Sequence, residues 1–315
     1  ALLSDGSNQA YDRLLLTTGA TPFIPPCEGT EKKGVFALRT LDDAVAIKAY
    51  AQSASTAIVI GGGLLGLETA RALHMAGLAV TVVEFFPYLL PRQLDPPGAQ
   101  VLQSLLEAQG LSIITGATTT AVLGQTRADC IHLKDGRIVK GDLVLFSTGV
   151  RSQTTLAEAT GLQVNRGIVV NASLQTNHPH IFAAGDVAEF EGAVYGIIPP
   201  SIEQARIAAA NMVELGSATY TGTVPTTTLK VAGAELTSLG KSTAEGNAYQ
   251  QLRYINVEAG RYRKLVVRAG HVVGAILLND PERTRAYTAL VTNQIDVSKH
   301  IEHITADAFD VQALI

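Results

Sequence analysis

The sequence has only two cysteines, little imbalance of charge and no long apolar run. Cys27 and Cys130 lie far apart and form no C-x-x-C pair, which argues against a disulfide framework, a zinc site and a redox-active dithiol. The 24 basic and 28 acidic side chains give a net charge of −4, so we expect neither a nucleic-acid partner nor a membrane surface. The apolar runs have strand length, below the roughly 18 residues that span a bilayer. A reducing cytoplasm is the expected location.

What the sequence does contain is enough apolar residues for a large globular fold. With 315 residues, 47% of them hydrophobic, it can form two or three domains. Its most informative stretch is 56–84, where a β-branched apolar run leads into glycines at G-x-G-x-x-G spacing. Between a strand and a helix, such glycines allow a tight turn and close approach to a pyrophosphate, and the helix start offers free N–H groups. The candidate anion-binding turn comprises Gly61, Gly62, Gly63, Leu64, Leu65 and Gly66.

An acid stands at the end of the second strand of this stretch. Residues 64–75 have apolar side chains at three- and four-residue steps, which predicts a helix that Gly77 ends, and 78–83 form the next strand. Glu84 follows Gly61 by 23 residues, close to the spacing of about 20 for a carboxylate that accepts from the adenosine ribose. Because a 2′-phosphate there would be repelled, the pattern favours NAD(H) over NADP(H). The alternative is a glycine-rich turn in an ordinary parallel sheet.

Two parts of the chain repeat the same landmarks. Each has a D-G turn, a second Asp seven residues later and a Gly seven residues after that. The landmarks are Asp5, Asp12 and Gly19 in one copy and Asp135, Asp142 and Gly149 in the other. In the second copy the glycine turn lies 74 residues before the D-G turn, so we expect a matching turn roughly 70 residues before Ala1, in a longer polypeptide. The alternative is chance resemblance between two D-G hairpins, a common turn.

Local signals predict the starts of several helices. Thr40 and Asp43 have the spacing of a capping box before a helix at 41–52. Asp95 is an expected N-cap, with prolines in the first turn of the helix that follows up to residue 108. Ser201 is the expected N-cap of a helix at 202–215.

Alternating patterns predict strands in two other regions. Short segments at 118–123, 129–133 and 137–140 resemble a small antiparallel meander. A separate α+β module follows, with strands at 226–232, 235–240, 250–256, 262–268 and 271–278, and polar helical segments from Pro281 to the end. His300 and His303 in that region are better explained by a surface helix than by metal binding, and we expect no metal site.

The order of these motifs resembles the flavin-dependent pyridine nucleotide-disulfide oxidoreductase superfamily. The resembling elements are the T-T-G and S-T-G crossing points that end at Gly19 and Gly149, the opening GGGLLGLE, and TNHPHIFAAGDVAEF at 176–190. Within it, GGGLLGLETARAL, PRQLD, YGIIPPSIEQAR and RYRKLVVRAGHVVGAILLND look most like the reductase portion of NAD(P)H nitrite reductase large subunits and like NADH:rubredoxin reductases. The resemblance covers nearly the whole chain, which lacks the family's first glycine turn for the ADP half of FAD.

This resemblance implies an α/β fold in which a Rossmann-like NAD-binding domain is inserted in a truncated FAD-binding domain, with a C-terminal α+β domain. The implied segments are 1–50 and 151–220 for the FAD-type domain, 51–150 for the NAD-binding domain and 221–315 for the C-terminal interface domain. By position, that last domain serves dimer contacts in some relatives and partner docking in others. Its sequence does not distinguish a homodimer from a docking surface.

The resemblance also implies roles for individual residues. The glycine turn and Glu84 match the NAD site, and Glu68 matches a residue at the interface of nicotinamide and flavin. Gly185 and Asp186 match the turn that holds the ribityl and pyrophosphate end of FAD. The segment beside the isoalloxazine and the crossing points are matched by Glu203, Gln204, Thr18, Gly19 and Gly149. Glu68 and Glu203 are thus the candidate catalytic residues, although a first-turn glutamate also simply favours the helix dipole, and Asp186 could be only a cap.

The implied activity is hydride transfer from NADH to FAD, followed by electron transfer to a metal-containing acceptor such as a nitrite-reducing module or a rubredoxin. Two alternatives stay open. One is a catalytically inactive NAD-binding fragment without FAD. The other is an NADH oxidase or peroxidase type of flavoenzyme, whose redox cysteine would lie upstream of these residues.

Overall fold

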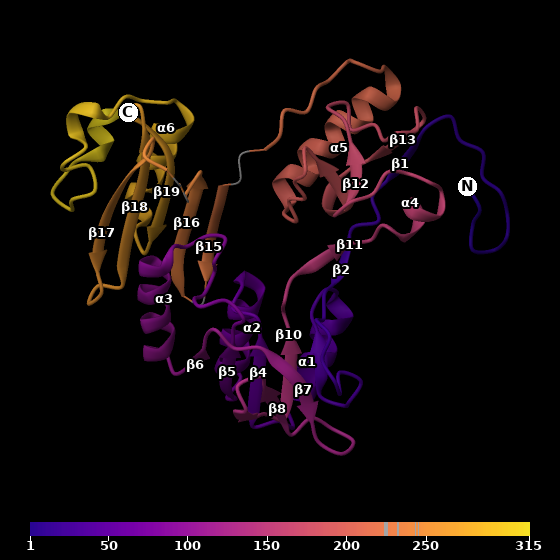
Figure 1. The fold of residues 1–315 in the computed structure, drawn as a ribbon, viewed down its shortest axis with the longest axis horizontal. Coiled ribbons are helices and arrows are strands. Elements are labelled where there is room, and N and C mark those ends of the chain that lie inside the picture. The colour runs from indigo at the N-terminus through magenta and orange to yellow at the C-terminus, as the bar shows by residue number, and fades with distance from the viewer. Residues whose placement is uncertain (224–225, 232, 243, 245) are drawn as a thin grey trace. The chain divides into compact units, whose positions relative to one another are not determined.

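The computed structural model describes residues 1–223, 226–231, 233–242, 244 and 246–315. The chain forms two compact units, whose course Figure 1 shows by colour. Unit 1 consists of Ala1–Pro22 and Val150–Thr223, and unit 2 of Phe23–Gly149 and Val224–Ile315. The predicted first segment, 1–50, is thus divided between the units, because the residues after Pro22 join the parallel sheet of unit 2. The four-segment division stays a prediction.

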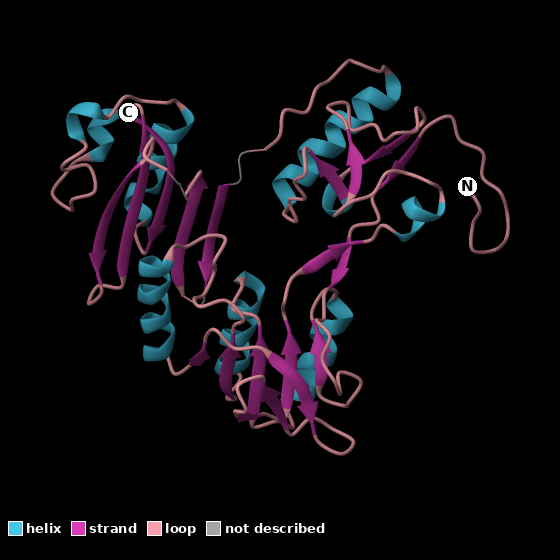
Figure 2. Ribbon diagram, in the orientation of Figure 1, coloured by secondary structure: helices cyan, strands magenta, loops and turns pink. Residues whose placement is uncertain are grey.

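Unit 2 contains a five-stranded parallel sheet with the order β3-β10-β4-β5-β6. Figure 2 draws strands in magenta and helices in cyan. Its strands are β3 (Val35–Ala37), β4 (Thr56–Ile60), β5 (Ala79–Val83), β6 (Ser112–Ile114) and β10 (Leu143–Phe146). The helices between them are α1 (Leu41–Ala51), α2 (Leu64–Met75) and α3 (Pro96–Ala108). The predicted bounds of α2 are confirmed. Phe23–Gly149 is called the parallel-sheet domain below.

Both faces of this sheet are covered, which is why its strands read as continuous apolar runs. Successive side chains of a strand point to opposite faces. Val59 and Val82 belong to a core cluster with residues of α1, α2 and α3. Ile58 and Val83 belong to another cluster, with residues of the meander β7 (Thr119–Leu123), β8 (Cys130–Leu133) and β9 (Ile138–Lys140). The predicted meander is confirmed and is antiparallel.

Two predicted helix caps are confirmed. Oγ1 of Thr40 accepts from the N–H of Asp43 at 3.2 Å, and the Asp43 carboxylate accepts from the N–H of Thr40 at 2.7 Å, which is a capping box. Asp95 Oδ1 accepts from the N–H of Gly98 at 3.4 Å, at the start of α3. In both helices a side-chain oxygen replaces the acceptor that a helix start lacks.

The predicted N-cap at Ser201 is wrong. The helix α5 (Ile198–Val213) begins earlier and carries Pro199 and Pro200 in its first turn. Proline is tolerated there because the missing N–H would have no intrahelical partner. Ser201 lies inside the helix, where its hydroxyl donates to the carbonyl of Ile197 at 3.0 Å.

Unit 1 is built from short strand pairs around α5. Strand β1 (Leu14–Leu16) runs parallel to β13 (Ile181–Ala183), and β12 (Ile168–Val170) runs parallel to β14 (Ala188–Phe190). Strand β2 (Ala20–Pro22) pairs antiparallel with β11 (Val150–Ser152), and α4 (Thr155–Ala159) and η1 (Gly185–Val187) complete the unit. Its core includes the fully buried Leu174 and Phe182.

The repeated landmarks have the same local conformation. Asp5 and Asp135 each accept a hydrogen bond from the backbone N–H two residues on, at 2.8 and 3.1 Å. Gly19 and Gly149, at the ends of the copies, have φ angles of +70° and +97°, in the region that favours glycine. The two stretches therefore share their turn geometry as well as their spacing.

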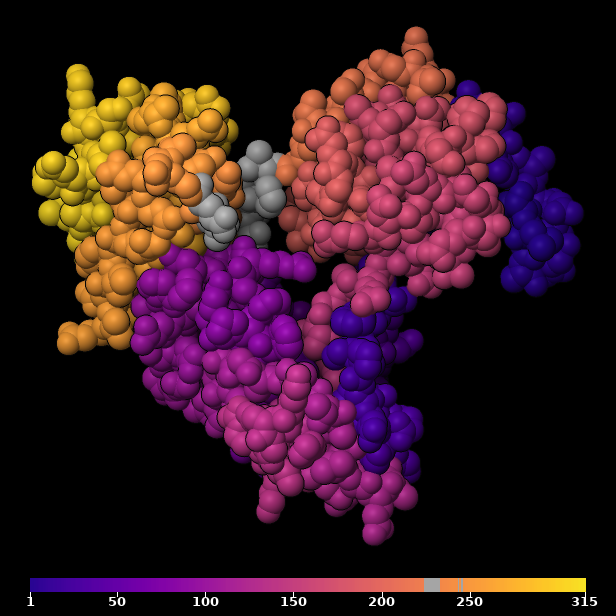
Figure 3. Space-filling model, viewed as in Figure 1, coloured from indigo at the N-terminus to yellow at the C-terminus, as the bar shows by residue number. Residues whose placement is uncertain are grey.

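The C-terminal module, from residue 226 onward, contains an antiparallel sheet with the order β15-β16-β19-β18-β17. The strands are β15 (Thr226–Val231), β16 (Ala234–Gly240), β17 (Gln250–Asn256), β18 (Arg261–Arg268) and β19 (His271–Leu278), and α6 (Pro281–Thr292) follows. In Figure 3 the orange surface of this sheet adjoins the purple surface of the parallel-sheet domain. Only short 3-10 turns, η2 (Ser298–His300) and η3 (Val311–Leu314), follow α6, so His300 and His303 share no helix face.

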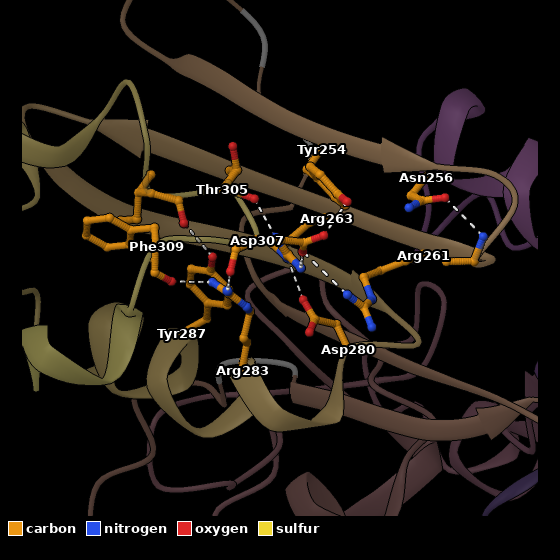
Figure 4. A network of polar contacts seen from close by, with 12 residues as sticks. Tyr254, Asn256, Arg261, Arg263, Asp280, Arg283, Tyr287, Thr305, Asp307 and Phe309 are labelled. Carbon is orange, nitrogen blue, oxygen red and sulfur yellow. Dashed lines mark hydrogen bonds and ion pairs between the residues drawn. The ribbon is translucent and has the colours of Figure 1, made fainter.

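A buried arginine holds the C-terminal tail on this sheet (Figure 4). Arg263 on β18 is fully buried. Its guanidinium pairs with Asp280, donates to the carbonyl of Thr305 and lies 2.8 Å from Oδ1 of Asp307. Tyr254 stacks under the guanidinium at 4.7 Å and donates its hydroxyl proton to Asp307. The guanidinium of Arg263 therefore binds the C-terminal tail to the sheet through Thr305 and Asp307. Among the helices of the described residues, none is both long and apolar enough to cross a membrane.

Candidate functional site

The glycines of the turn between β4 and α2 have different surroundings. Gly61 has a φ angle of +116°, and a Cβ there would lie 2.2 Å from the carbonyl oxygen of Ser147. At Gly66 a Cβ would lie 2.1 Å from the carbonyl oxygen of Gly61, so the helix packs on the turn without room for a methyl group. At Gly63, by contrast, a Cβ would meet nothing within 4 Å. The turn therefore has an open side at its middle glycine.

The first turn of α2 begins at this open glycine. Gly63 is the N-cap of α2 and supplies no side-chain cap. The N–H groups of Leu64, Leu65 and Gly66 have no acceptor within the helix, because the carbonyls four residues earlier belong to residues before the helix. Free N–H groups and the positive end of the helix dipole suit a phosphate. The sequence-predicted turn is thus one contiguous structure with donors and space for an anion.

Glu84 lies directly next to the turn, at the end of β5. Its side chain is 5% exposed, its Oε2 accepts from the N–H of Gly62, and its Oε1 accepts from the N–H of Phe86 at 2.8 Å. A Cβ on Gly62 would come within 3.0 Å of Oε2. A carboxylate has about four acceptor positions, so two remain for the hydroxyls of a ribose. These residues fit the adenosine and pyrophosphate of a dinucleotide.

Gly149 and Glu68 are the other two predicted residues of unit 2. Gly149 accepts, through its carbonyl, from the N–H of Phe23 at 2.9 Å, where the chain leaves unit 2. Glu68 is exposed on α2, one turn after the free N–H groups, and no hydrogen bond or ion pair joins it to another described residue. Its carboxylate is thus available to a ligand, but no contact of the protein orients it.

In unit 1, the predicted flavin residues gather at the carboxyl ends of β1 and β13. These strands are parallel neighbours, with Leu16 beside Ala183, so the turns that follow them share one edge of the sheet. Gly19 and Gly185 both have positive φ angles, +70° and +82°. Thr18 donates to the carbonyl of Gln153 at 2.7 Å. The carboxyl edge of parallel strands is where α/β sheets bind ligands.

Gln204 joins this turn to α5. It is 1% exposed, and its Oε1 accepts from the N–H of Gly185 at 2.8 Å. The backbone carbonyl of Asp186 accepts from the hydroxyl of Ser152 at 2.7 Å, which holds the same turn from the β11 side. A Cβ on Gly185 would have its nearest neighbour, Ser201, at 3.7 Å. The turn is therefore rigid yet open, as the pyrophosphate end of FAD would require.

Two residues near Glu203 were missed by the sequence analysis. Thr223 donates its hydroxyl proton to Oε2 of Glu203 at 2.6 Å and lies 2.7 Å from the hydroxyl of Tyr220. Tyr220 in turn lies 3.5 Å from Nε2 of Gln204. Burial raises the pKa of Tyr220, so its phenol stays protonated. No local pattern marks a Tyr or Thr that follows the last residue of α5, Val213, by 7 or 10 residues, and only the fold places them beside Glu203.

Two family models together match most of the chain. Residues 2–211 match the family described as pyridine nucleotide-disulphide oxidoreductase, and 225–295 match the rubredoxin NAD+ reductase C-terminal domain. Nitrite reductase [NAD(P)H] of Bacillus subtilis is 39% identical over 291 residues, which cover 92% of this chain and 36% of that protein. Rubredoxin-NAD(+) reductase of Pseudomonas putida is 30% identical over 291 residues, which cover 90% of this chain and 74% of that protein.

A solved structure agrees with these matches. The ferredoxin reductase for the CYP199A2 system from Rhodopseudomonas palustris superposes with a TM-score of 0.86 at 26% identity, over 100% of this chain and 78% of that one. The chain spans about a third of the length of the nitrite reductases that it matches. The resemblance and the fold class predicted from the sequence motifs are confirmed. The chain belongs to the pyridine nucleotide-disulphide oxidoreductase family, whose members are NAD(P)H-dependent FAD oxidoreductases.

Proposed function

We propose that this chain is the reductase segment of an NADH-dependent flavoprotein that passes electrons to a metal-containing acceptor. The observation that carries the proposal is the pair formed by the open glycine turn at Gly63 and the buried carboxylate of Glu84 beside it. A family member with this pair has the means to bind a dinucleotide with an unsubstituted ribose. FAD, when bound, supplies the chemistry that accepts a hydride and releases electrons.

The protein's own groups would bind and orient the cofactors. The first N–H groups of α2 would hold the NADH pyrophosphate, and Glu84 would accept from the ribose hydroxyls. The turn at Gly185 and Asp186, held by Gln204, would carry the pyrophosphate end of FAD. Glu203 and Glu68 are the proposed groups nearest the reacting rings. These roles support orientation and local charge, which is what a protein contributes to cofactor chemistry.

We propose NADH rather than NADPH as the electron donor. Glu84 is 5% exposed and has the adjacent N–H groups of Gly62 and Phe86 as donors. A 2′-phosphate next to this carboxylate would place two acidic groups in contact.

The acceptor is proposed from the relatives. They are named for nitrite, rubredoxin and ferredoxin, which points to a metal-containing protein or module as the partner. A homodimer through the C-terminal module stays a prediction, and the native mass of the purified protein tests it. We also propose a cytoplasmic location, since Cys27 and Cys130 are both unpaired, as is typical of a reducing compartment.

An anaerobic titration tests the function. The purified protein is supplied with FAD, freed of excess, and titrated with NADH and, separately, with NADPH while the visible spectrum is recorded. We expect a flavin spectrum that NADH bleaches at a concentration about tenfold below that of NADPH, equivalent to about 1.4 kcal/mol. A protein that binds NADH but retains no flavin would be a nucleotide-binding fragment, contrary to the proposal. Equal responses to the two coenzymes would contradict the role of Glu84.

A further inference from the structure

Asp95 connects the parallel-sheet domain to the C-terminal module. Its Oδ1 accepts from the hydroxyl of Tyr262 at 2.6 Å, and its Oδ2 accepts from Nζ of Lys264 at 3.1 Å and from Nε of Arg253 at 3.2 Å. The donors lie on β17 and β18, whereas the carboxylate lies at the start of α3. Asp95, Tyr262 and Lys264 are 6%, 0% and 2% exposed. Asp95 and its three donors, Tyr262, Lys264 and Arg253, form the Asp95 network.

The backbones around the network lie unusually close together. A Cβ on Gly98, in the first turn of α3, would come within 2.8 Å of the Tyr262 ring. A Cβ on Gly260, just before β18, would come within 2.4 Å of the side chain of Leu105. Glycine at both positions lets α3 and β18 approach, so a shift of the sheet would displace the start of α3.

The loop before Asp95 begins at the proposed ribose carboxylate. The N–H of Phe86 donates to Glu84, and the N–H of Leu90 donates to the carbonyl of Gly62 at 3.2 Å. The loop thus forms one wall of the glycine turn. The fully buried side chains of the loop are Leu89, Leu90 and Leu94. The loop is thus held through Asp95 at one end and through Glu84 at the other.

The polarity of the network is not explained by stability alone. Burying an ion pair costs desolvation energy, and the attraction between the two charges only roughly offsets this cost. Apolar side chains of similar size are often at least as stabilising. Burial by itself would raise the pKa of Asp95, but the hydrogen bond from Tyr262 and the charge of Lys264 together hold it below its usual value. Burial and the bond to Asp95 raise the pKa of Tyr262, so the phenol remains a donor. Three donors of the C-terminal module therefore fix the orientation of one carboxylate.

We infer that Tyr262, Lys264 and Arg253 of the C-terminal module are positioning residues for NADH. They hold Asp95, Asp95 holds the loop, and the loop holds Gly62 and Glu84 in the geometry that binds the dinucleotide. The inference rests on the proposed NADH site. It gives the C-terminal module a part in coenzyme binding without any contact between that module and the coenzyme.

The test compares two Tyr→Phe variants of the whole chain. Tyr262→Phe removes the hydroxyl that donates to Asp95, and Tyr254→Phe removes the hydroxyl that donates to Asp307 in the same sheet. Each loses one bond to a carboxylate, but only Tyr262 is linked to the loop. We expect the Kd for NADH, measured by calorimetry well below the melting temperature, to rise about tenfold in Tyr262→Phe and less than twofold in Tyr254→Phe.

Two further measurements separate positioning from mere stability. Amide hydrogen exchange in the peptide that contains Leu90 should accelerate in Tyr262→Phe and not in Tyr254→Phe, because the bond to Gly62 opens more often. Arg253→Gln, at a side chain that is 37% exposed, should fold normally and raise the Kd about threefold. An unchanged Kd in both network variants overturns the inference alone. Failure of the unaltered protein to bind NADH overturns the proposed function and the inference with it.

Discussion

At the scale of single residues, one glycine motif contains positions with opposite requirements. Gly66 is surrounded by backbone, and its Cβ would lie 2.1 Å from the carbonyl oxygen of Gly61. Gly63 faces open space and has a φ angle of −79°, which any residue can adopt. The need for glycine at Gly66 therefore comes from the fold, whereas at Gly63 it comes from the proposed ligand.

This difference predicts opposite results for two Gly→Ala variants. Gly63→Ala should leave the melting temperature within about a degree and weaken NADH binding at least about tenfold, because the methyl group occupies the space of the pyrophosphate. Gly66→Ala should lose about 1–3 kcal/mol of unfolding free energy through overpacking, despite the better helix propensity of alanine. Calorimetry and thermal unfolding measure the two effects. Normal NADH affinity in Gly63→Ala would show that the open side is not the phosphate site.

At the scale of elements, the C-terminal tail depends on charge. Asp307 is 44% exposed, yet its carboxylate accepts from Tyr254 and lies 2.8 Å from Nη2 of the buried Arg263 (Figure 4). These hydrogen bonds lower the pKa of Asp307 from 3.8 to about 2. Because the ionised form is favoured in the folded state, the stabilisation is fully present above the unfolded pKa and is lost as the pH falls through the folded pKa.

Asp307→Asn should therefore destabilise the protein in a pH-dependent way. At neutral pH we expect a loss on the order of 1 kcal/mol, since the group is partly exposed and screened by solvent. The difference between the unaltered protein and the variant should shrink as the pH falls from about 4 toward about 2. Urea unfolding across this pH range measures it. A difference of constant size down to the lowest pH would mean that geometry, and not the ionised carboxylate, holds the tail.

At the scale of the whole molecule, each unit contains one of the proposed half-sites. The turn from Gly61 to Gly66 and Glu84 lie in unit 2, and the turn at Gly185 with Gln204 lies in unit 1. Both units are made of segments that are discontinuous in the sequence, because the chain passes between them after Pro22, after Gly149 and after Thr223. Binding of one ligand should therefore stabilise one unit more than the other.

Scanning calorimetry with NADH tests this division. We expect two unfolding transitions, and NADH at about a hundredfold its Kd should add about 2.7 kcal/mol to the transition of unit 2 only. FAD should act on the transition of unit 1. Amide hydrogen exchange, followed on peptides of each unit, assigns the transitions. A single transition that both ligands shift equally would contradict independent units.

The family and most elements could be predicted from the sequence because their causes are local. A β-branched run, three glycines and an apolar helix period within 30 residues specify the strand, turn and helix that end at Met75, and the predicted bounds of α2 are those observed. Asp95 could likewise be recognised as a cap. By contrast, the start of α5 could not, since two prolines are compatible both with a preceding loop and with a first turn.

The sequence by itself therefore determined the glycine turn, the acid after it and the family to which they belong. Only the tertiary structure decided which side of the turn is open, and that Asp95 meets Tyr262, 167 residues away. The predicted strand at 262–268 contains Tyr262 and Lys264, but the sequence assigned them no partner. Local patterns act over a few residues, whereas long-range contacts depend on how all the elements pack.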